Sequence, residues 1–178
     1  MKTVLFISAI LIIFMAKNSI SQDYMYLDDE MLYKKGEYLY EFGILKIDVY
    51  QVSLFCDTAL CSQTDMFSNK GSYALKFIYQ RDIKSKYSKK GWEIGLKKNL
   101  KNRYIDYRSE VNWLKKITTD YKKDDEVILH INRDKLTFYK NNEILAEVRN
   151  AKLTEIVFLP WLGTNPIKKA CRNNLLEM

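Results

Sequence analysis

The segment from Ile44 to Phe55, ILKIDVYQVSLF, limits the possible folds of this chain more than any other. Its apolar residues recur with a period of two, and β-branched and aromatic side chains prevail, which is typical of a β-strand. One side of the predicted strand carries Leu45, Ile47, Val49 and Phe55, and the other carries Ile44, Tyr50, Val52 and Leu54. Apolar residues on both faces indicate a central strand, covered on one side and partly on the other.

Further strands are predicted before and after this segment. Residues 36–42 form a short strand after an irregular lead-in over 22–35, and residues 56–71 form a polar connection to a strand over 72–80. Three more strands follow at 125–132, 135–140 and 143–149. The turn signals between these three predict an antiparallel meander. Within it, His130 alternates with the apolar face of its strand, so we expect an exposed or edge histidine.

Helical spacing appears between the two groups of strands and again at the end of the chain. In residues 84–100 the apolar residues Trp92, Leu96 and Leu100 recur every four positions. Other helices are predicted over 106–120, over 153–163 with an interruption at Pro160, and from Asn165-Pro166 onward. Strands grouped apart from helices predict an α+β fold, in which one antiparallel sheet is covered on one face by a layer of helices. Residues 22–178 suit a single domain.

The helix predicted over 84–100 belongs to a strongly basic stretch, residues 81–103, in which Asp82 and Glu93 are the acids. A basic amphipathic helix of this kind predicts contact with an anionic membrane through residues 84–101. The same pattern also fits the solvated outer face of a helix that packs on a sheet. The net charge of +7 is spread among many acidic residues, so it does not indicate nucleic-acid binding.

The N-terminus has the pattern of a secretory signal peptide. Lys2 precedes an apolar stretch over 4–16, and Ser19-Ile20-Ser21 provides small residues at a cleavage site. The apolar stretch is too short to span a bilayer, which argues against an uncleaved anchor. The sequence therefore predicts a signal peptide over 1–21 and an exported protein, periplasmic or secreted.

The cysteines bear on the same compartment. In an oxidising compartment Cys56 and Cys61 could form a disulfide and leave Cys171 unpaired, although free thiols remain the alternative. A zinc site would need further cysteines or histidines, and His130 is the only histidine. The sequence predicts no metal and no cofactor.

The order of these segments resembles the chalcone isomerase-like family, in particular its exported bacterial branch. The resemblance covers about 36–176 and rests on Gly36-Glu37 before a strand, IDVYQVSLF (47–55), YALKFIYQRDI (73–83), LTFYKNNEILAEV (136–148) and VFLPWLGTNPIKKACRNNLL (157–176). It implies an open-faced β-sandwich, in which an antiparallel sheet carries one layer of helices and a hydrophobic ligand cleft lies between them.

The resemblance also shows which catalytic features of chalcone isomerase are missing. The family's catalytic hydroxyl positions fall on Leu45 and Pro160, and no Arg lies between Gly36 and Gly43. The helical Tyr and Asn of the family fall near Ile105 and on Asn112. At least three of five features are absent, and such chemistry needs donors where negative charge develops. The resemblance therefore implies a protein without chalcone isomerase activity.

The leading hypothesis is an exported, non-catalytic protein that holds an apolar or amphipathic small molecule, such as a fatty acid, in the cleft. Leu45 and Pro160 would line it, Tyr104, Tyr107 and Asn112 would supply polar contacts, and Arg103 or Arg108 would meet a carboxylate. One alternative is a cell-envelope scaffold with a filled core and no ligand. Another is an isomerase or lyase on a different substrate, although no spacing ties His130, Asp106, Glu110 and Tyr107 into a site.

Overall fold

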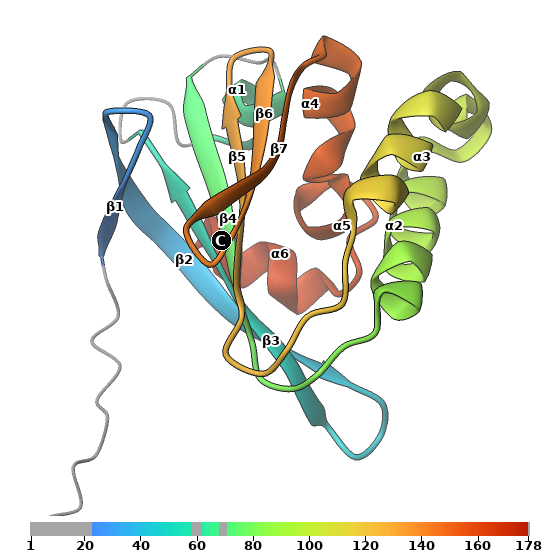
Figure 1. Cartoon of the computed structure of the whole chain (residues 1–178). Helices are drawn as coiled ribbons and strands as arrows, with labels where there is room; N and C mark the ends of the chain where they lie inside the picture. Colours follow the sequence, from blue (N-terminus) through green and yellow to red (C-terminus); the bar gives the residue numbers. More distant parts are fainter. Residues whose placement is uncertain (1–22, 58–61, 68–70, 178) are drawn as a thin grey trace, which may run out of the picture.

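Seven strands form one antiparallel sheet in which each strand pairs with the next along the chain (Figure 1). The computed structural model describes residues 23–57, 62–67 and 71–177, so the predicted signal peptide over 1–21 and Cys61 lie outside the described residues. The strands are β1 (Tyr24–Leu27), β2 (Glu30–Phe42), β3 (Ile47–Cys56), β4 (Ser72–Tyr79), β5 (Glu126–Asn132), β6 (Lys135–Lys140) and β7 (Glu143–Arg149).

The helices lie between the strands and at the end of the chain. They are α1 (Gln63–Phe67), α2 (Ser85–Leu100), the 3₁₀ helix η2 (Lys101–Tyr107), α3 (Arg108–Ile117), α4 (Ala151–Val157), α5 (Leu159–Leu162) and α6 (Lys169–Leu176). Figure 1 shows α2 to α6 on one side of the curved sheet, with β1 on the other. The predicted α+β architecture is therefore confirmed.

Each face of the sheet is apolar, but the two faces are covered differently. On the helical side, Val52 and Leu54 of β3 are fully buried in the main core, which continues through α2, α3, α5 and α6. On the opposite side, the hairpin of β1 and β2 bends over the sheet. Met25 and Leu32 from this hairpin bury Phe55 of β3 in a second, smaller core. The sheet is thus protected on both faces without a second layer of helices.

The lead-in over 22–35, predicted to be irregular, instead forms β1 and the first part of β2. Asp28 and Asp29 both have positive φ and make the tight turn between the two strands. The period-two signal was weak there because tyrosines and charged residues occupy the outer positions. The strand predicted from Ile44 begins at Ile47, because Gly43 (φ 73°) and Lys46 (φ 47°) are in the turn that precedes it.

The helix predicted over 106–120 is shorter, since α3 runs from Arg108 to Ile117. α2 ends at Leu100 because Lys101 has a non-helical backbone (φ 52°), and the 3₁₀ helix of residues 101–107 lies between α2 and α3. Thr118 returns to an extended backbone. Thr118 Oγ1 donates to the Leu114 carbonyl oxygen (2.7 Å) and accepts from the Trp92 indole nitrogen (3.1 Å). The end of α3 is therefore fixed to α2 by a buried hydrogen bond.

The interruption predicted at Pro160 is present, but the break lies earlier, at Phe158 between α4 and α5. Pro160 sits in the first turn of α5, where its missing N–H costs nothing. It packs against Gly95 of α2, where a Cβ atom would meet Pro160 Cβ at 2.8 Å. The pair lets α2 and α5 approach closely.

Gly36 has the same role between β2 and α6. A Cβ at this position would lie 2.1 Å from the Asn174 carbonyl oxygen and 2.8 Å from that of Leu175. Because both are backbone atoms, the helix would have to move as a unit. The glycine thus permits the direct contact of the last helix with the second strand.

We expect Gly36→Ala to destabilise the protein by about 2 kcal/mol or more, since overpacking against backbone cannot be relieved by a rotamer change. The matched control is Gly91→Ala in α2, where nothing lies within 4 Å of the new Cβ. That change should stabilise the fold by about 0.5–1 kcal/mol through helix propensity. Urea unfolding of both variants checks this, and equal midpoints for the two would contradict it.

Candidate functional site

The pocket best suited to an apolar group lies at the edge of the helical layer, where α1, α2, η2, α4 and α5 meet. Its volume is about 240 Å³. Apolar walls come from Phe67, Leu100 and Leu159, and polar atoms come from Asn99, Arg103 and Glu155. A pocket with apolar walls and a few polar groups is the usual form of a small-molecule site.

The polar groups at this pocket form one connected network. Arg103 Nη2 donates to the Tyr107 hydroxyl (2.5 Å) and to Glu155 Oε1 (3.2 Å). The Tyr107 hydroxyl in turn donates to Glu155 Oε2 (2.8 Å). Burial, followed by the hydrogen bond to Glu155, raises the pKa of Tyr107, so its hydroxyl stays a proton donor at neutral pH. The network thus presents a cation and a phenolic donor to one carboxylate.

Asn99 holds the neighbouring wall of the pocket in place. Its Nδ2 donates to the carbonyl oxygens of Gly95 (2.9 Å), Leu159 (3.1 Å) and Asn165 (2.9 Å), and its Oδ1 accepts from the Asn165 backbone N–H (2.9 Å). A Cβ on Gly163 would collide with Oδ1 at 2.3 Å. One amide therefore ties α2 to α5 and to the segment that follows it.

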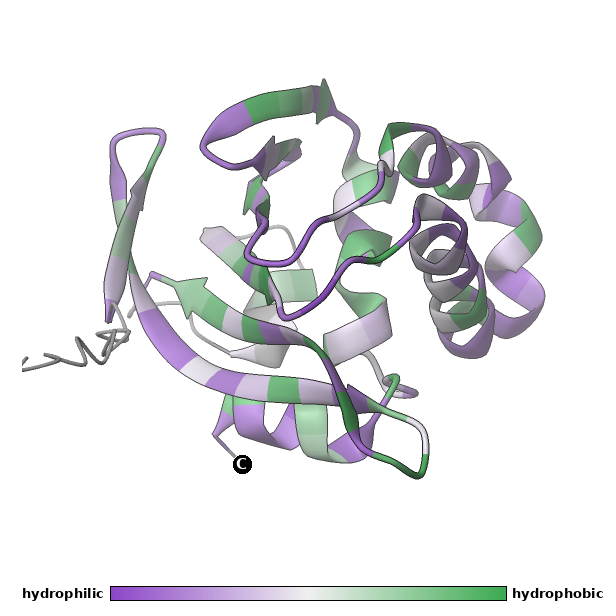
Figure 2. Ribbon diagram, turned by 60° about the horizontal axis from the view of Figure 1, so that its bottom comes forward, coloured by the Kyte–Doolittle hydropathy of each residue, from purple (hydrophilic) through white to green (hydrophobic). Residues whose placement is uncertain are grey.

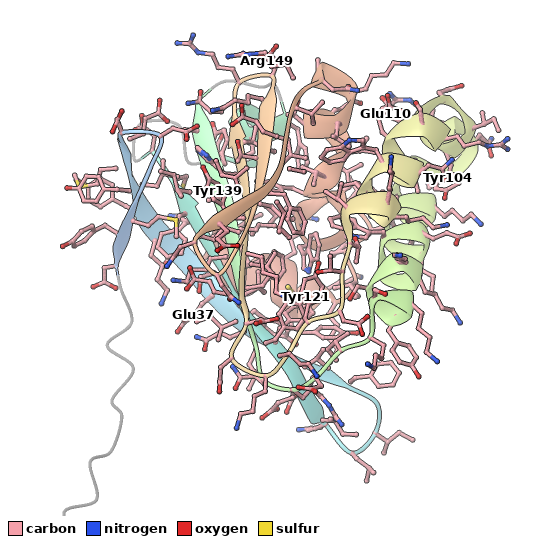
Figure 3. All side chains as sticks on the ribbon, in the orientation of Figure 1. Glu37, Tyr104, Glu110, Tyr121, Tyr139 and Arg149 are labelled. Atoms are coloured by element: carbon pink, nitrogen blue, oxygen red, sulfur yellow. The ribbon has the colours of Figure 1, made fainter. Side chains whose placement is uncertain are left out.

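The centre of the space between sheet and helices is filled by aromatic side chains. The Trp161 indole N–H donates to the Tyr50 hydroxyl (3.0 Å). The Trp161 ring lies 4.9 Å from Phe77 and 5.3 Å from Trp92, measured between centroids. The ring of Tyr121, labelled in Figure 3, stacks on Tyr79 at 4.3 Å. These contacts occupy the region in which the family resemblance implies a cleft.

A larger groove of about 510 Å³ lies elsewhere, between β2 and the end of α6, and its lining is mostly polar. Lys34 Nζ lies 2.5 Å from Glu37, and Lys35 Nζ lies 3.2 Å from Glu177. Because these cations already have carboxylate partners, the groove suits an apolar ligand less well than the smaller pocket does.

The predicted ligand residues are divided between several places. Arg103 lines the pocket. Tyr107 does not line it, but its hydroxyl accepts a hydrogen bond from Arg103. Tyr104 is half-buried on η2 with Lys97 over its ring at 5.3 Å, and Asn112 is exposed on α3. Arg108 is exposed at the start of α3 and does not line the pocket.

The positions assigned to the lost catalytic hydroxyls lie far apart in the fold. Leu45 is in the exposed turn between β2 and β3, and Pro160 is buried against Gly95. Neither lines a described pocket. This placement does not support a cleft that Leu45 and Pro160 share, because the turn points away from the helical layer. Figure 1 shows the turn at the lower end of the molecule.

Sequence reasoning missed Asn99, Glu155, Phe67, Leu100 and Leu159 as pocket residues. Asn99 carried a usable signal, because it lies beside the apolar stripe of α2 formed by Trp92 and Leu96. A polar side chain next to a buried stripe must find hydrogen-bond partners, and such partners mark a junction between elements. No comparable signal existed for Glu155, whose role depends on Arg103 and Tyr107 from a distant part of the chain.

The basic helix α2 turns its apolar stripe inward. Trp92, Leu96 and Leu100 are all buried against neighbouring elements. Its lysines form the outer surface, as the alternative of a solvated face requires. Contact with an anionic membrane through residues 84–101 stays a prediction, and it would have to rest on charge because the stripe is not available.

His130 is fully buried, which contradicts the predicted exposed or edge position. The β1–β2 hairpin covers this face of the sheet, and its turn brings Asp28 Oδ2 within 3.8 Å of His130 Nδ1. His130 Nε2 and Ser72 Oγ are 2.8 Å apart. Ser72, His130 and Asp28 thus lie in the spatial order of a hydrolase triad. Both Ser72 and His130 are buried, and neither lines a described pocket, so a substrate cannot reach the Ser72 hydroxyl.

The cysteines fit the expected arrangement in part. Cys56 is buried and disulfide-bonded, and its predicted partner Cys61 lies outside the described residues, so the pairing itself stays a prediction. Cys171 is free and buried, and burial raises the pKa of its thiol to about 12.

Within 23–57, 62–67 and 71–177, no group of acidic, cysteine and histidine side chains has the arrangement of a metal site. In the same part of the chain, no helix has the length and apolar character needed to cross a bilayer.

An antiparallel sheet with one layer of helices on it defines an open-faced β-sandwich. The sequence profile of the chalcone isomerase-like family matches residues 44–177. The chain therefore belongs to the chalcone isomerase-like family. No curated protein matches it in sequence.

Among solved structures, the chain is similar to a fatty-acid binding protein of Arabidopsis thaliana. The two share 12% sequence identity with a TM-score of 0.66, over 82% of this chain and 87% of the plant protein. At this identity the likeness concerns the fold.

The buried His130 makes stability depend on pH. Burial is the main cause that lowers the pKa of His130 from 6.5, while Asp28 and Glu30 act in the opposite direction and Lys135 adds to the lowering. A lowered pKa means that the folded state favours the neutral imidazole. Its contribution is therefore complete above the unfolded pKa and is lost as the pH falls toward the folded pKa.

When the pH falls from about 7.5 to about 5.5, we expect the free energy of unfolding to decrease less for His130→Gln than for the wild-type protein, because glutamine does not titrate. Urea unfolding at both pH values measures this difference. Since the chain has one histidine, an NMR titration of its imidazole reports the folded pKa directly. A folded pKa at or above 6.5 would contradict the assignment.

Proposed function

We propose that this protein is a non-catalytic binder of an amphipathic small molecule of the fatty-acid class. The observation that carries the proposal is the position of Arg103, whose guanidinium group lies at a pocket with the apolar walls Phe67, Leu100 and Leu159. Membership in the chalcone isomerase-like family and the fold shared with a fatty-acid binding protein support it.

The head group of the ligand takes the place of Glu155. In the ligand-free arrangement Glu155 accepts from both Arg103 and Tyr107, and its side chain is 39% exposed. A ligand carboxylate accepts the same two hydrogen bonds after Glu155 rotates into solvent. Hydrogen bonds to an ionised carboxylate are worth about 1.5–3 kcal/mol each, so this exchange selects acids over neutral lipids.

The pocket also limits the length of the tail. Its volume of about 240 Å³ lies below the ~300–1,000 Å³ typical of small-molecule sites. The aromatic contacts of Trp161 with Tyr50 and Phe77 prevent its extension toward the sheet. We infer that the site takes a medium-length acyl chain, or one end of a longer one.

The filled centre of the fold supports a second candidate, a cell-envelope scaffold that carries no ligand. The contacts of Trp161 leave the sheet–helix interface solid, as that alternative requires. The two functions differ in whether the pocket at Arg103 takes a fatty acid.

We expect Arg103→Ala to weaken decanoate binding about tenfold or more, since it removes a charge-assisted hydrogen bond. Glu155→Gln should tighten binding severalfold, because it removes the carboxylate that competes for Arg103. Arg108→Ala is the matched control and should bind like the wild type. Displacement of a fluorescent fatty acid measures all three, with palmitate as the longer competitor.

Equal weakening by Arg103→Ala and Arg108→Ala would place the ligand elsewhere. If the fluorescent fatty acid does not bind the wild-type protein at all, the result favours the scaffold function instead.

We also propose that the protein is exported and that residues 1–21 are removed. The support is the pattern of Lys2, the apolar stretch over 4–16 and the small residues before Gln22. The intact mass of protein recovered from the periplasm or medium should correspond to a chain that starts at Gln22. A mass that retains residues 1–21 would contradict cleavage.

A further inference from the structure

The turn between β2 and β3 exposes a continuous group of apolar side chains. Phe42 is 64% exposed, Ile44 100%, Leu45 85% and Ile47 38%. We call these four residues the apolar tip, and Figure 2 shows its hydrophobic colouring at the end of the hairpin. We propose that the apolar tip inserts into the interface of a lipid bilayer that contains anionic lipids.

The hairpin projects beyond the sheet that supports it. Pairing of β3 with β4 starts at Tyr50, which faces Tyr79, whereas pairing of β3 with β2 continues to Phe42 and Ile47. A register shift between Tyr40 and Glu41 marks where the projecting part begins. Of the neighbouring strands, only β2 therefore pairs with the last residues of β3, and Figure 1 shows this end of the hairpin below the rest of the sheet.

The fold itself does not require apolar residues at the tip. The turn depends on the backbone of Gly43 and Lys46, which both have positive φ, and polar residues suit such turns better. Ile44 and Leu45 make no contribution to either core of the described chain. Single exposed apolar side chains are common, but a continuous exposed group marks an interaction site.

The size and shape of the tip favour a bilayer over a protein partner. A stable protein interface contains about 20–30 residues on each side, far more than one turn provides. A convex tip of large apolar side chains instead matches the depth of about 5–10 Å to which interfacial elements enter a bilayer.

Lysines beside the tip supply complementarity to anionic head groups. Lys46 is in the turn itself. Lys168 donates to the Glu41 carbonyl oxygen (2.6 Å), which places the start of α6, with Lys169, next to the hairpin. Residues 41–48 carry Glu41, Lys46 and Asp48, so the further cations beside the tip come from the start of α6. Cations near the surface favour contact with an anionic leaflet.

The test compares Ile44→Trp with Ile144→Trp in the full-length chain. Ile144 is also an exposed isoleucine, 58% exposed on β7 and outside residues 84–101, so it is a matched control. Vesicles of phosphatidylcholine and phosphatidylglycerol with brominated acyl chains quench tryptophans that enter the bilayer. This local measurement is needed because residues 4–16 are apolar and have their own affinity for lipid. The native tryptophans give a background common to both variants.

We expect severalfold stronger quenching of the added tryptophan at position 44 than at position 144. Quenching should also be weaker when phosphatidylglycerol is left out. Equal quenching at the two positions overturns the proposal. The same holds if sedimentation velocity finds a dimer that Ile44→Ser together with Leu45→Ser converts to a monomer, because the tip would then bind a second copy of this chain.

Discussion

The hydrogen bond from the Trp161 indole to the Tyr50 hydroxyl, set among stacked aromatic rings, is the contact on which the arrangement of sheet and helices depends. It joins α5 to β3, and the Trp161 ring reaches Phe77 of β4 and Trp92 of α2 as well. Burial of the Tyr50 hydroxyl is tolerated because it has this donor, and burial holds its pKa far above the usual value. A solid centre follows, and the described pocket with apolar walls lies at the edge of the helical layer.

Asn99 and Arg103, two polar side chains on successive helical turns, shape that edge. Asn99 ties α2 to Leu159 of α5 by one hydrogen bond and to Asn165 by two more, and Arg103, one turn later, points its charge toward α4. The change from α-helix to 3₁₀ helix at Lys101 lies between them. Tyr107 then falls opposite Glu155. The pocket and its polar network are thus consequences of how one helix ends.

Local patterns in the sequence were sufficient for most strands. The meander from 126 to 149 was predicted to within a residue, because its turns carry strong signals and its strands alternate cleanly. The strand β1 and the first part of β2 were missed, since their apolar residues face a second core that exists only after the chain bends back over Phe55. His130 was misplaced for the same reason: alternation shows which face a residue lies on, but it does not show what covers that face.

The pocket was harder to predict than the fold. Arg103 and Tyr107 are close in sequence and were both proposed, but Glu155 and Leu159 reach them only through tertiary packing. Leu45 shows the limit of transferring positions from a family, because a residue count places it near a catalytic position while the turn carries it to the surface.

The contact of α6 with β2 at Gly36 also has a bearing on how the molecule is made. The last helix rests on a strand that is synthesised more than a hundred residues earlier, and such distant pairings form late in folding. Each strand of the sheet pairs with the next along the chain, whereas Gly36 of β2 contacts Asn174 of α6. Because α6 covers β2 at Gly36, this side of β2 stays uncovered until α6 has been synthesised.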